Sequence, residues 1–218
     1  MKIIAPIAKV DEVLPLIRAG ADEIYCGVFT HEWLRDYGHI DSSNRRHCCH
    51  ASLKDYKELA SVIKIAHSNN TRVNVAINEF YPRQQYPLVL EQGKRVMELK
   101  PDVIVISDMG LLFTLGKNKP EGLNICMSVV SSAFNSGTVD FYKRWGASKV
   151  VLPREIIIGE ILDISNNNPG IELETIILNC KCKNIEGFCT FQHGFGFASY
   201  QKYSKIFSGT FPGKILDR

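Results

Sequence analysis

The chain lacks the features of a membrane or exported protein. None of its apolar runs approaches the ~18 residues that a membrane-spanning helix needs. The amino terminus, MKIIAPIAKV, has only a short apolar stretch before the charged residues Lys9 and Asp11, which is unlike a signal peptide. We therefore expect a cytoplasmic protein that does not enter membranes.

Strong charge of one sign is also missing. The formal net charge of the 218 residues is +3, whereas binding to a phosphate backbone depends on a clustered basic patch. Composition alone therefore leaves RNA binding open. With 45% hydrophobic and 22% charged residues, the chain has an ordinary globular composition and is long enough for one substantial core.

Several motifs that would assign a reaction are absent. No glycine-rich phosphate turn follows the first expected strand, which argues against a dinucleotide-binding fold. No GxSxG or HExxH sequence is present, which argues against the hydrolases that these motifs mark. The seven cysteines are an odd number, and in a reducing compartment we expect thiols or metal ligands rather than disulfides.

The chain does contain a regular alternation of expected strands and helices. This alternation predicts a parallel α/β sheet with right-handed crossovers, and we favour a TIM-barrel-like (β/α) barrel over an open sheet. A complete barrel usually takes ~250 residues, so the barrel is expected to be compact or incompletely closed. No linker-like segment interrupts the pattern, and residues 1–218 are expected to form a single domain. The expected strands are 2–7, 23–28, 72–77, 102–107, 124–129, 149–152 and 173–178, and the expected helices are 11–19, 53–68, 87–99, 110–115, 136–145 and 156–164.

The last expected strand, 173–178, runs into a loop that contains three cysteines. Its apolar run is typical of a strand buried on both faces of a parallel sheet. Loops at the carboxyl ends of such strands carry the functional residues of α/β proteins. The loop holds Cys180, Cys182 and Cys189 close to lysines, and positive charge favours the thiolate form.

These cysteines are candidate metal ligands. An iron-sulfur cluster takes four thiolates, and zinc also takes four ligands. The sequence RRHCCH, residues 45–50, lies in the long loop after the second strand and opens onto the same face of a barrel, so we expect Cys49 or its neighbour Cys48 to complete the set. In the alternative interpretation the loop cysteines are buried or unligated thiols. For residues 45–50 the alternatives are that Arg45 and Arg46 bind an anion, or that the segment is a solvated basic loop.

Polar residues also follow several other expected strands. The carboxyl ends of parallel strands meet at one end of a barrel, so we expect these side chains to surround one pocket. Glu155 is the candidate acid, base or ligand, and Arg154 is the candidate that orients an anion. In the alternative, Glu155 is a charge that the amino terminus of a helix favours. The candidate catalytic residues are Asn78, Asp108, Ser128, Arg154 and Glu155.

Four segments of the chain resemble peptidase family U-32, the collagenase-like peptidases. One carries a glutamate, a hydrophobic strand, a cysteine, four residues, a glycine, one residue and a second cysteine, here Glu174, Cys182, Gly187 and Cys189. Residues 179–181, Asn-Cys-Lys, replace the small residues that the family usually has before its first cysteine. The other segments, in the family's order, are APIAKVDEVLPLIRAGADEIYCG, VISDMGLL and MSVVSSAFNSGTVDFYKRWGASKVVLPRE.

The resemblance implies a barrel-like core and a choice between two activities. Some members of the family hold a four-iron four-sulfur cluster and hydroxylate RNA bases or quinone precursors without oxygen, whereas the family is named after a peptidase activity. The last two cluster cysteines usually lie downstream, and no cysteine follows Cys189 here. We expect an iron-sulfur enzyme, with zinc as the alternative metal, that acts on an RNA base or a small aromatic molecule. The alternatives are a peptidase and a non-catalytic subunit that forms a hetero-oligomer with a longer homologue.

Overall fold

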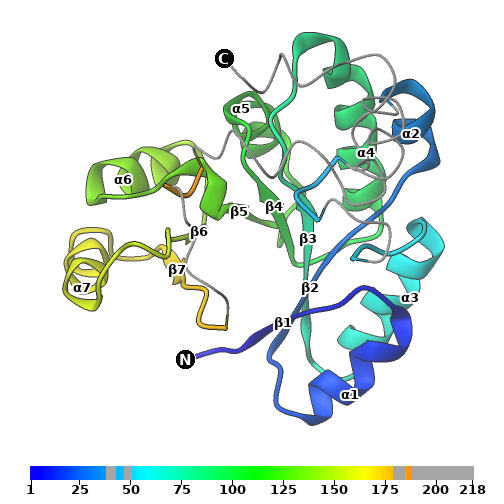
Figure 1. Cartoon of the computed structure of the whole chain (residues 1–218), viewed down its shortest axis with the longest axis horizontal. Helices are drawn as coiled ribbons and strands as arrows, with labels where there is room; N and C mark the ends of the chain where they lie inside the picture. The colour runs from blue at the N-terminus through cyan, green and yellow to red at the C-terminus, as the bar shows by residue number, and fades with distance from the viewer. Residues whose placement is uncertain (38–42, 47–50, 179–184, 188–218) are drawn as a thin grey trace, which may run out of the picture.

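The fold is a curled sheet of seven parallel strands. A computed structural model describes residues 1–37, 43–46, 51–178 and 185–187. Within these residues each strand pairs in parallel with the next one along the chain, and the sheet forms a half-barrel with helices around its convex side (Figure 1). The prediction of a parallel, TIM-barrel-like α/β fold is confirmed. The strands are β1 Ile4–Pro6, β2 Glu23–Gly27, β3 Arg72–Ile77, β4 Val103–Ile106, β5 Asn124–Met127, β6 Lys149–Val151 and β7 Glu172–Glu174.

Helices connect the strands, and side chains cap several of them. Asp55, Asp108 and Asn135 each accept a hydrogen bond from a backbone N–H in the first turn of the helix that follows, which satisfies donors left free at helix starts. Helix α2 was not predicted from the sequence. No described helix has the length and apolar character needed to cross a membrane. The helices are α1 Val13–Arg18, α2 His31–Tyr37, α3 Tyr56–His67, α4 Tyr86–Glu98, α5 Met109–Asn118, α6 Ser136–Arg144 and α7 Ile158–Asn167, with 3-10 turns at Val10–Glu12, Arg83–Gln85 and Val129–Ser131.

Alternate residues of each central strand face the two sides of the sheet, and both sides are buried. In β4, Ile104 and Ile106 pack in the large core beneath the helices, whereas Val103 and Val105 belong to a smaller cluster on the opposite side. This explains why the central strands read as continuous apolar runs.

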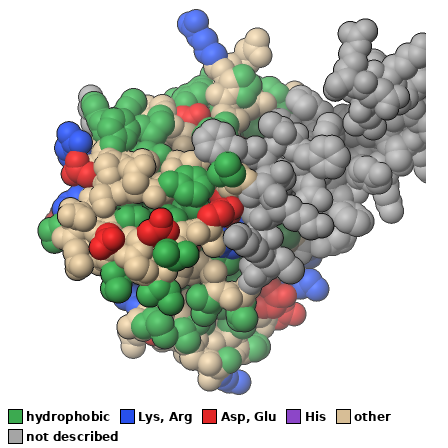
Figure 2. Space-filling model, turned by 60° about the vertical axis from the view of Figure 1, so that its left-hand side comes forward, with side chains coloured by type: hydrophobic (Ala, Val, Ile, Leu, Met, Phe, Trp, Pro, Cys, Tyr) green, Lys and Arg blue, Asp and Glu red, His purple; other side chains and the backbone are tan. Residues whose placement is uncertain are grey.

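The prediction for the seventh strand is wrong in its extent and its burial. β7 ends at Glu174 and its residues are only partly buried, whereas Ile177 and Leu178 expose 79% and 93% of their surface. Among the described residues β7 is the last strand of the sheet and pairs with β6 alone, so no described strand covers the apolar run that follows it. Figure 2, which turns this side of the molecule forward, shows hydrophobic side chains on the surface.

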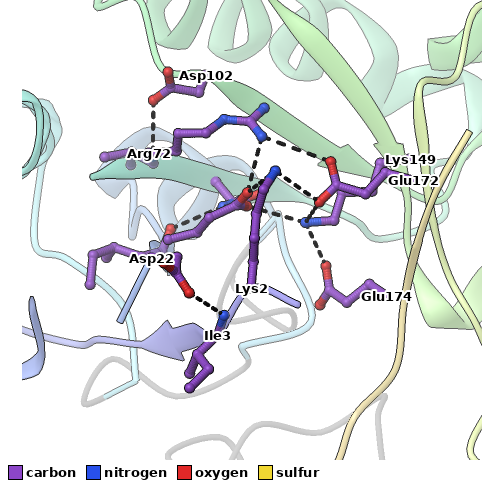
Figure 3. A network of polar contacts seen from close by, with 12 residues as sticks. Lys2, Ile3, Asp22, Arg72, Asp102, Lys149, Glu172 and Glu174 are labelled. Carbon is purple, nitrogen blue, oxygen red and sulfur yellow. Dashed lines mark hydrogen bonds and ion pairs between the residues drawn. The ribbon is translucent and has the colours of Figure 1, made fainter. Parts of the chain in front are cut away.

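A charged network crosses the concave side of the half-barrel near the amino-terminal ends of the strands (Figure 3). Glu23 at the start of β2 is fully buried, and it accepts from Lys149 of β6 at 3.2 Å, Arg72 of β3 at 3.0 Å and Asn74 at 2.8 Å. Lys149 also lies 3.0 Å from Glu174 of β7. The network therefore joins β2 and β3 to β6 and β7, on the other side of the curl. Lys2 and Glu172 complete it, with their charged atoms 3.5 Å apart.

Candidate functional site

The carboxyl-terminal end of the half-barrel, which we call the mouth, carries a chain of hydrogen bonds between neighbouring strands. Asn78 follows β3, and its side-chain amide donates to the hydroxyl of Ser128, which follows β5, at 3.0 Å. Ser107, which follows β4, donates to the backbone carbonyl of Asn78 at 2.9 Å. All three side chains are buried. Because the Ser128 oxygen is the acceptor in this bond, its own hydrogen is left to donate to another group.

Residues 43–46 extend over this end of the sheet. The backbone N–H of Arg45 donates to the Asn78 side-chain oxygen at 2.9 Å, and the Arg45 guanidinium lies 2.9 Å from the carboxylate of Glu79. Arg46 donates to the backbone carbonyls of Ile7 and Ala51, at 2.7 and 2.5 Å. The alternative of an anion held by Arg45 and Arg46 is therefore weakened, because Arg45 already forms an ion pair with Glu79 and Arg46 already donates to two backbone carbonyls.

Glu79 is a carboxylate that titrates near neutral pH. Its side chain is only 12% exposed. Burial raises the pKa of Glu79 to about 7, although the charge of Arg45 and a backbone hydrogen bond at Phe80 act in the opposite direction. A group with such a pKa can accept and release a proton at physiological pH.

Arg154 and Glu155, which follow β6, form hydrogen bonds with the segment 185–187. Arg154 donates to the buried carboxylate of Glu186 from its backbone at 2.9 Å and from its guanidinium at 3.0 and 2.6 Å. Glu155 accepts from the backbone N–H of Glu186 at 3.3 Å. The second carboxylate oxygen of Glu155 is buried and has no hydrogen-bond partner among the described residues. Arg154 thus binds the protein's own Glu186 carboxylate. One carboxylate oxygen of Glu155 has no hydrogen-bond partner among the described residues and can accept a hydrogen bond from a ligand.

Asp108 has a local structural role. Its carboxylate accepts from the backbone N–H of Leu111, as the cap of α5, at 3.0 Å, and from the hydroxyl of Tyr86. The sequence predicts that Asp108, Ser128 and Glu155 surround one pocket, because all three follow strands. All three lie at the mouth end of the sheet, but the carboxylate of Asp108 is already hydrogen-bonded to residues of α5 and α4.

The predicted metal ligands Cys49, Cys180, Cys182 and Cys189 lie outside the described residues. Cys26 and Cys126 are described as free and buried, and burial raises the pKa of both thiols, that of Cys26 to about 12. Burial therefore disfavours the thiolate form of both side chains, which is the form that binds metals. Among the described residues no three metal-binding side chains come together.

A protein-family comparison decides the classification. The model for peptidase family U32 matches residues 8–201. The chain belongs to peptidase family U32. The solved structure of the U32 peptidase Mk0906 has a similar fold, with a TM-score of 0.59 and 13% sequence identity over 80% of this chain and 68% of that one.

Curated relatives of this U32 chain carry two kinds of name. The tRNA hydroxylation protein P of Haemophilus influenzae is 33% identical over 124 residues, which are 57% of this chain and 27% of that protein. The uncharacterized protease MJ0090 of Methanocaldococcus jannaschii is 27% identical over 195 residues, which are 87% of this chain and 43% of that protein. The chain thus spans less than half the length of these relatives.

Two residues of the U32 mouth were underestimated from the sequence. Neither Glu79 nor Glu186 is among the residues that the sequence predicts to be catalytic. Neither has a local signal, because the burial of Glu79 and the pairing of Glu186 with Arg154 depend on contacts across the fold. The spacing Cys182, Gly187, Cys189 did point to the segment that contains Glu186.

Proposed function

We propose that this chain is the barrel part of an enzyme that hydroxylates a base of tRNA. The observation that carries the proposal is the polar mouth, with a serine hydroxyl, a buried acceptor oxygen and a carboxyl group of near-neutral pKa at the strand ends. This is the end at which (β/α) barrels place their chemistry. Membership of family U32 and relatives named tRNA hydroxylation protein P support the choice of reaction.

The mouth residues would act as follows in this proposal. Ser128 donates its hydroxyl hydrogen to a polar atom of the substrate, while Asn78 fixes the direction of that hydroxyl. The unpaired oxygen of Glu155 accepts a hydrogen bond from the substrate base. Glu79 holds or releases a proton close to Asn78.

We further propose that Cys180, Cys182, Cys189 and Cys49 bind an iron-sulfur cluster, which would supply one-electron chemistry. Zinc remains the alternative metal. The support is the cysteine spacing in the sequence and the segment 185–187, which lies between Cys182 and Cys189 and is fastened to the mouth through Glu186.

A peptidase is the second candidate, because the family and the relative MJ0090 carry that name. Catalysis by Ser128 as a nucleophile would require an adjacent base. In the described part of the chain the hydrogen-bond partner of the Ser128 hydroxyl is the amide of Asn78, which cannot take up a proton. This favours a role in binding over a role as a nucleophile.

The test is anaerobic purification with reconstitution by iron and sulfide, followed by incubation with tRNA that lacks the modification and with a small-molecule extract of cells. The extract is included because replacing a C–H hydrogen by a hydroxyl group is a two-electron oxidation that requires an oxygen donor and an electron acceptor. We expect bound iron and sulfide, and a hydroxylated nucleoside detected by mass spectrometry. Glu155→Gln should abolish the product without unfolding the protein, whereas the exposed control Glu98→Gln should not. Cys182→Ser combined with Cys189→Ser should remove iron and sulfide. Full activity of this double variant, or peptide cleavage without any change in tRNA, would contradict the proposal.

A further inference from the structure

Phe80 is an exposed aromatic ring beside the polar mouth. It lies two residues after Asn78 and exposes 48% of its surface, whereas Asn78 and the next residue, Tyr81, are buried. In the loop after β3, the Phe80 ring therefore faces solvent although residues before and after it in the sequence are buried.

The ring of Phe80 is held next to a guanidinium group. The Arg45 guanidinium carbon lies over the ring, 5.9 Å from its centroid, a distance typical of a cation–π contact. Arg45 is itself fixed by Glu79 at 2.9 Å and by its backbone bond to Asn78. Asn78 in turn donates to Ser128. The position of the ring is therefore tied to the same side chains that form the mouth.

We infer that Phe80 is the platform on which a nucleobase stacks when single-stranded RNA binds at the mouth. This inference rests on the proposed function. Enzymes that modify a base must take it out of its stack, and the vacated contacts are commonly replaced by aromatic side chains and arginine planes. Phe80 with Arg45 provides such a pair of groups.

The charge near the platform favours RNA over an apolar partner. Arg83 is exposed three residues after Phe80, in the 3-10 turn that precedes α4. When Glu79 is ionised, its charge and that of Arg45 cancel. The net charge of the loop is then the positive charge of Arg83, which attracts phosphate.

The experiment measures binding of a fluorescently labelled single-stranded RNA to the full chain by anisotropy, at fixed salt. Loss of one stacked base costs roughly 5- to 150-fold in affinity, and we expect a weakening in this range for Phe80→Leu. Phe80→Trp should bind at least as tightly as the wild type. The matched control is Phe113→Leu. Phe113 lies on α5, is also exposed, and packs against Trp145, the residue that follows α6, rather than against the loop after β3. Circular dichroism should show that all variants fold.

The outcomes separate this inference from the proposed function. If Phe80→Leu binds RNA as tightly as the wild type while Glu155→Gln still abolishes hydroxylation, the platform is wrong and the function stands. If the wild type neither binds nor modifies RNA, both are wrong. If Phe80→Leu weakens binding of a peptide and not of RNA, the ring serves a peptidase and the inference is overturned.

Discussion

Lys149→Met is expected to destabilise the protein strongly, because it removes a buried partner of Glu23. Both side chains are almost completely inaccessible, and their charged atoms are 3.2 Å apart. Removing one partner of a buried ion pair typically costs about 3–5 kcal/mol, since the other charge is left uncompensated. Glu23 keeps its contacts with Arg72 and Asn74, so we expect about 3 kcal/mol, near the lower limit.

The assay is thermal and urea unfolding at pH 7. In a chain of this size 1 kcal/mol corresponds to ~2–4 °C in melting temperature, so Lys149→Met should melt about 6–12 °C below the wild type. The control is Lys2→Met, which removes a half-exposed lysine 3.6 Å from the same Glu23 and should cost at most ~1 kcal/mol. If both variants melt at the same temperature, the argument that burial makes Lys149 important is refuted.

The same network predicts a dependence on acid. Burial alone would raise the pKa of Glu23, but the hydrogen bond from Asn74 and the charges of Lys149 and Arg72 outweigh it and lower the pKa below 4.5. A carboxylate whose pKa is lowered by folding stabilises the protein above its unfolded pKa, and this contribution disappears as the pH falls through the folded value. The difference in stability between the wild type and Lys149→Met should therefore shrink below about pH 4.5.

Two further predictions concern the mouth. Because folding raises the pKa of Glu79 from 4.5 to about 7, the wild type should lose stability relative to Glu79→Gln as the pH rises from 4.5 to above 7, by up to roughly 3 kcal/mol in urea unfolding; parallel pH profiles would contradict this. Gly187→Ala should lower the melting temperature more than Gly170→Ala. Both glycines have positive φ, 89° and 82°, which costs another residue about 1–2 kcal/mol, but only at Gly187 would the new Cβ lie 1.9 Å from the hydroxyl of Ser132 and 2.7 Å from the carbonyl of Val130. Equal losses would show that the segment 185–187 is not packed against that loop.

The location of the site was partly predictable from the sequence. Asn78 and Ser128 come directly after an apolar run and Glu155 comes shortly after one, and parallel strands bring such positions to the same end of a sheet. Which of these side chains are available was not predictable. The pattern assigned the same role to Asp108, whose carboxylate caps α5 and accepts from Tyr86. It also assigned anion binding to Arg154, which instead donates to Glu186, 32 residues away.

The sequence by itself determined the order of the strands and helices. Periodicity and helix caps act between residues a few positions apart, so six of the seven strands and six helices were located within a few residues of their observed positions. Only the tertiary structure showed that β7 is the last strand of the described sheet and that Ile177 and Leu178, just after it, are exposed.

Tertiary structure alone decided the charge states and pairings. Glu23 and Lys149 are 126 residues apart, and each would be an ordinary surface charge if the sheet did not curl and bring them together. Glu79 has a near-neutral pKa because residues from the rest of the fold exclude water from it, which no neighbour in the sequence does. Burial and ion pairing depend on which distant segments come into contact, and those contacts exist only once the half-barrel has formed.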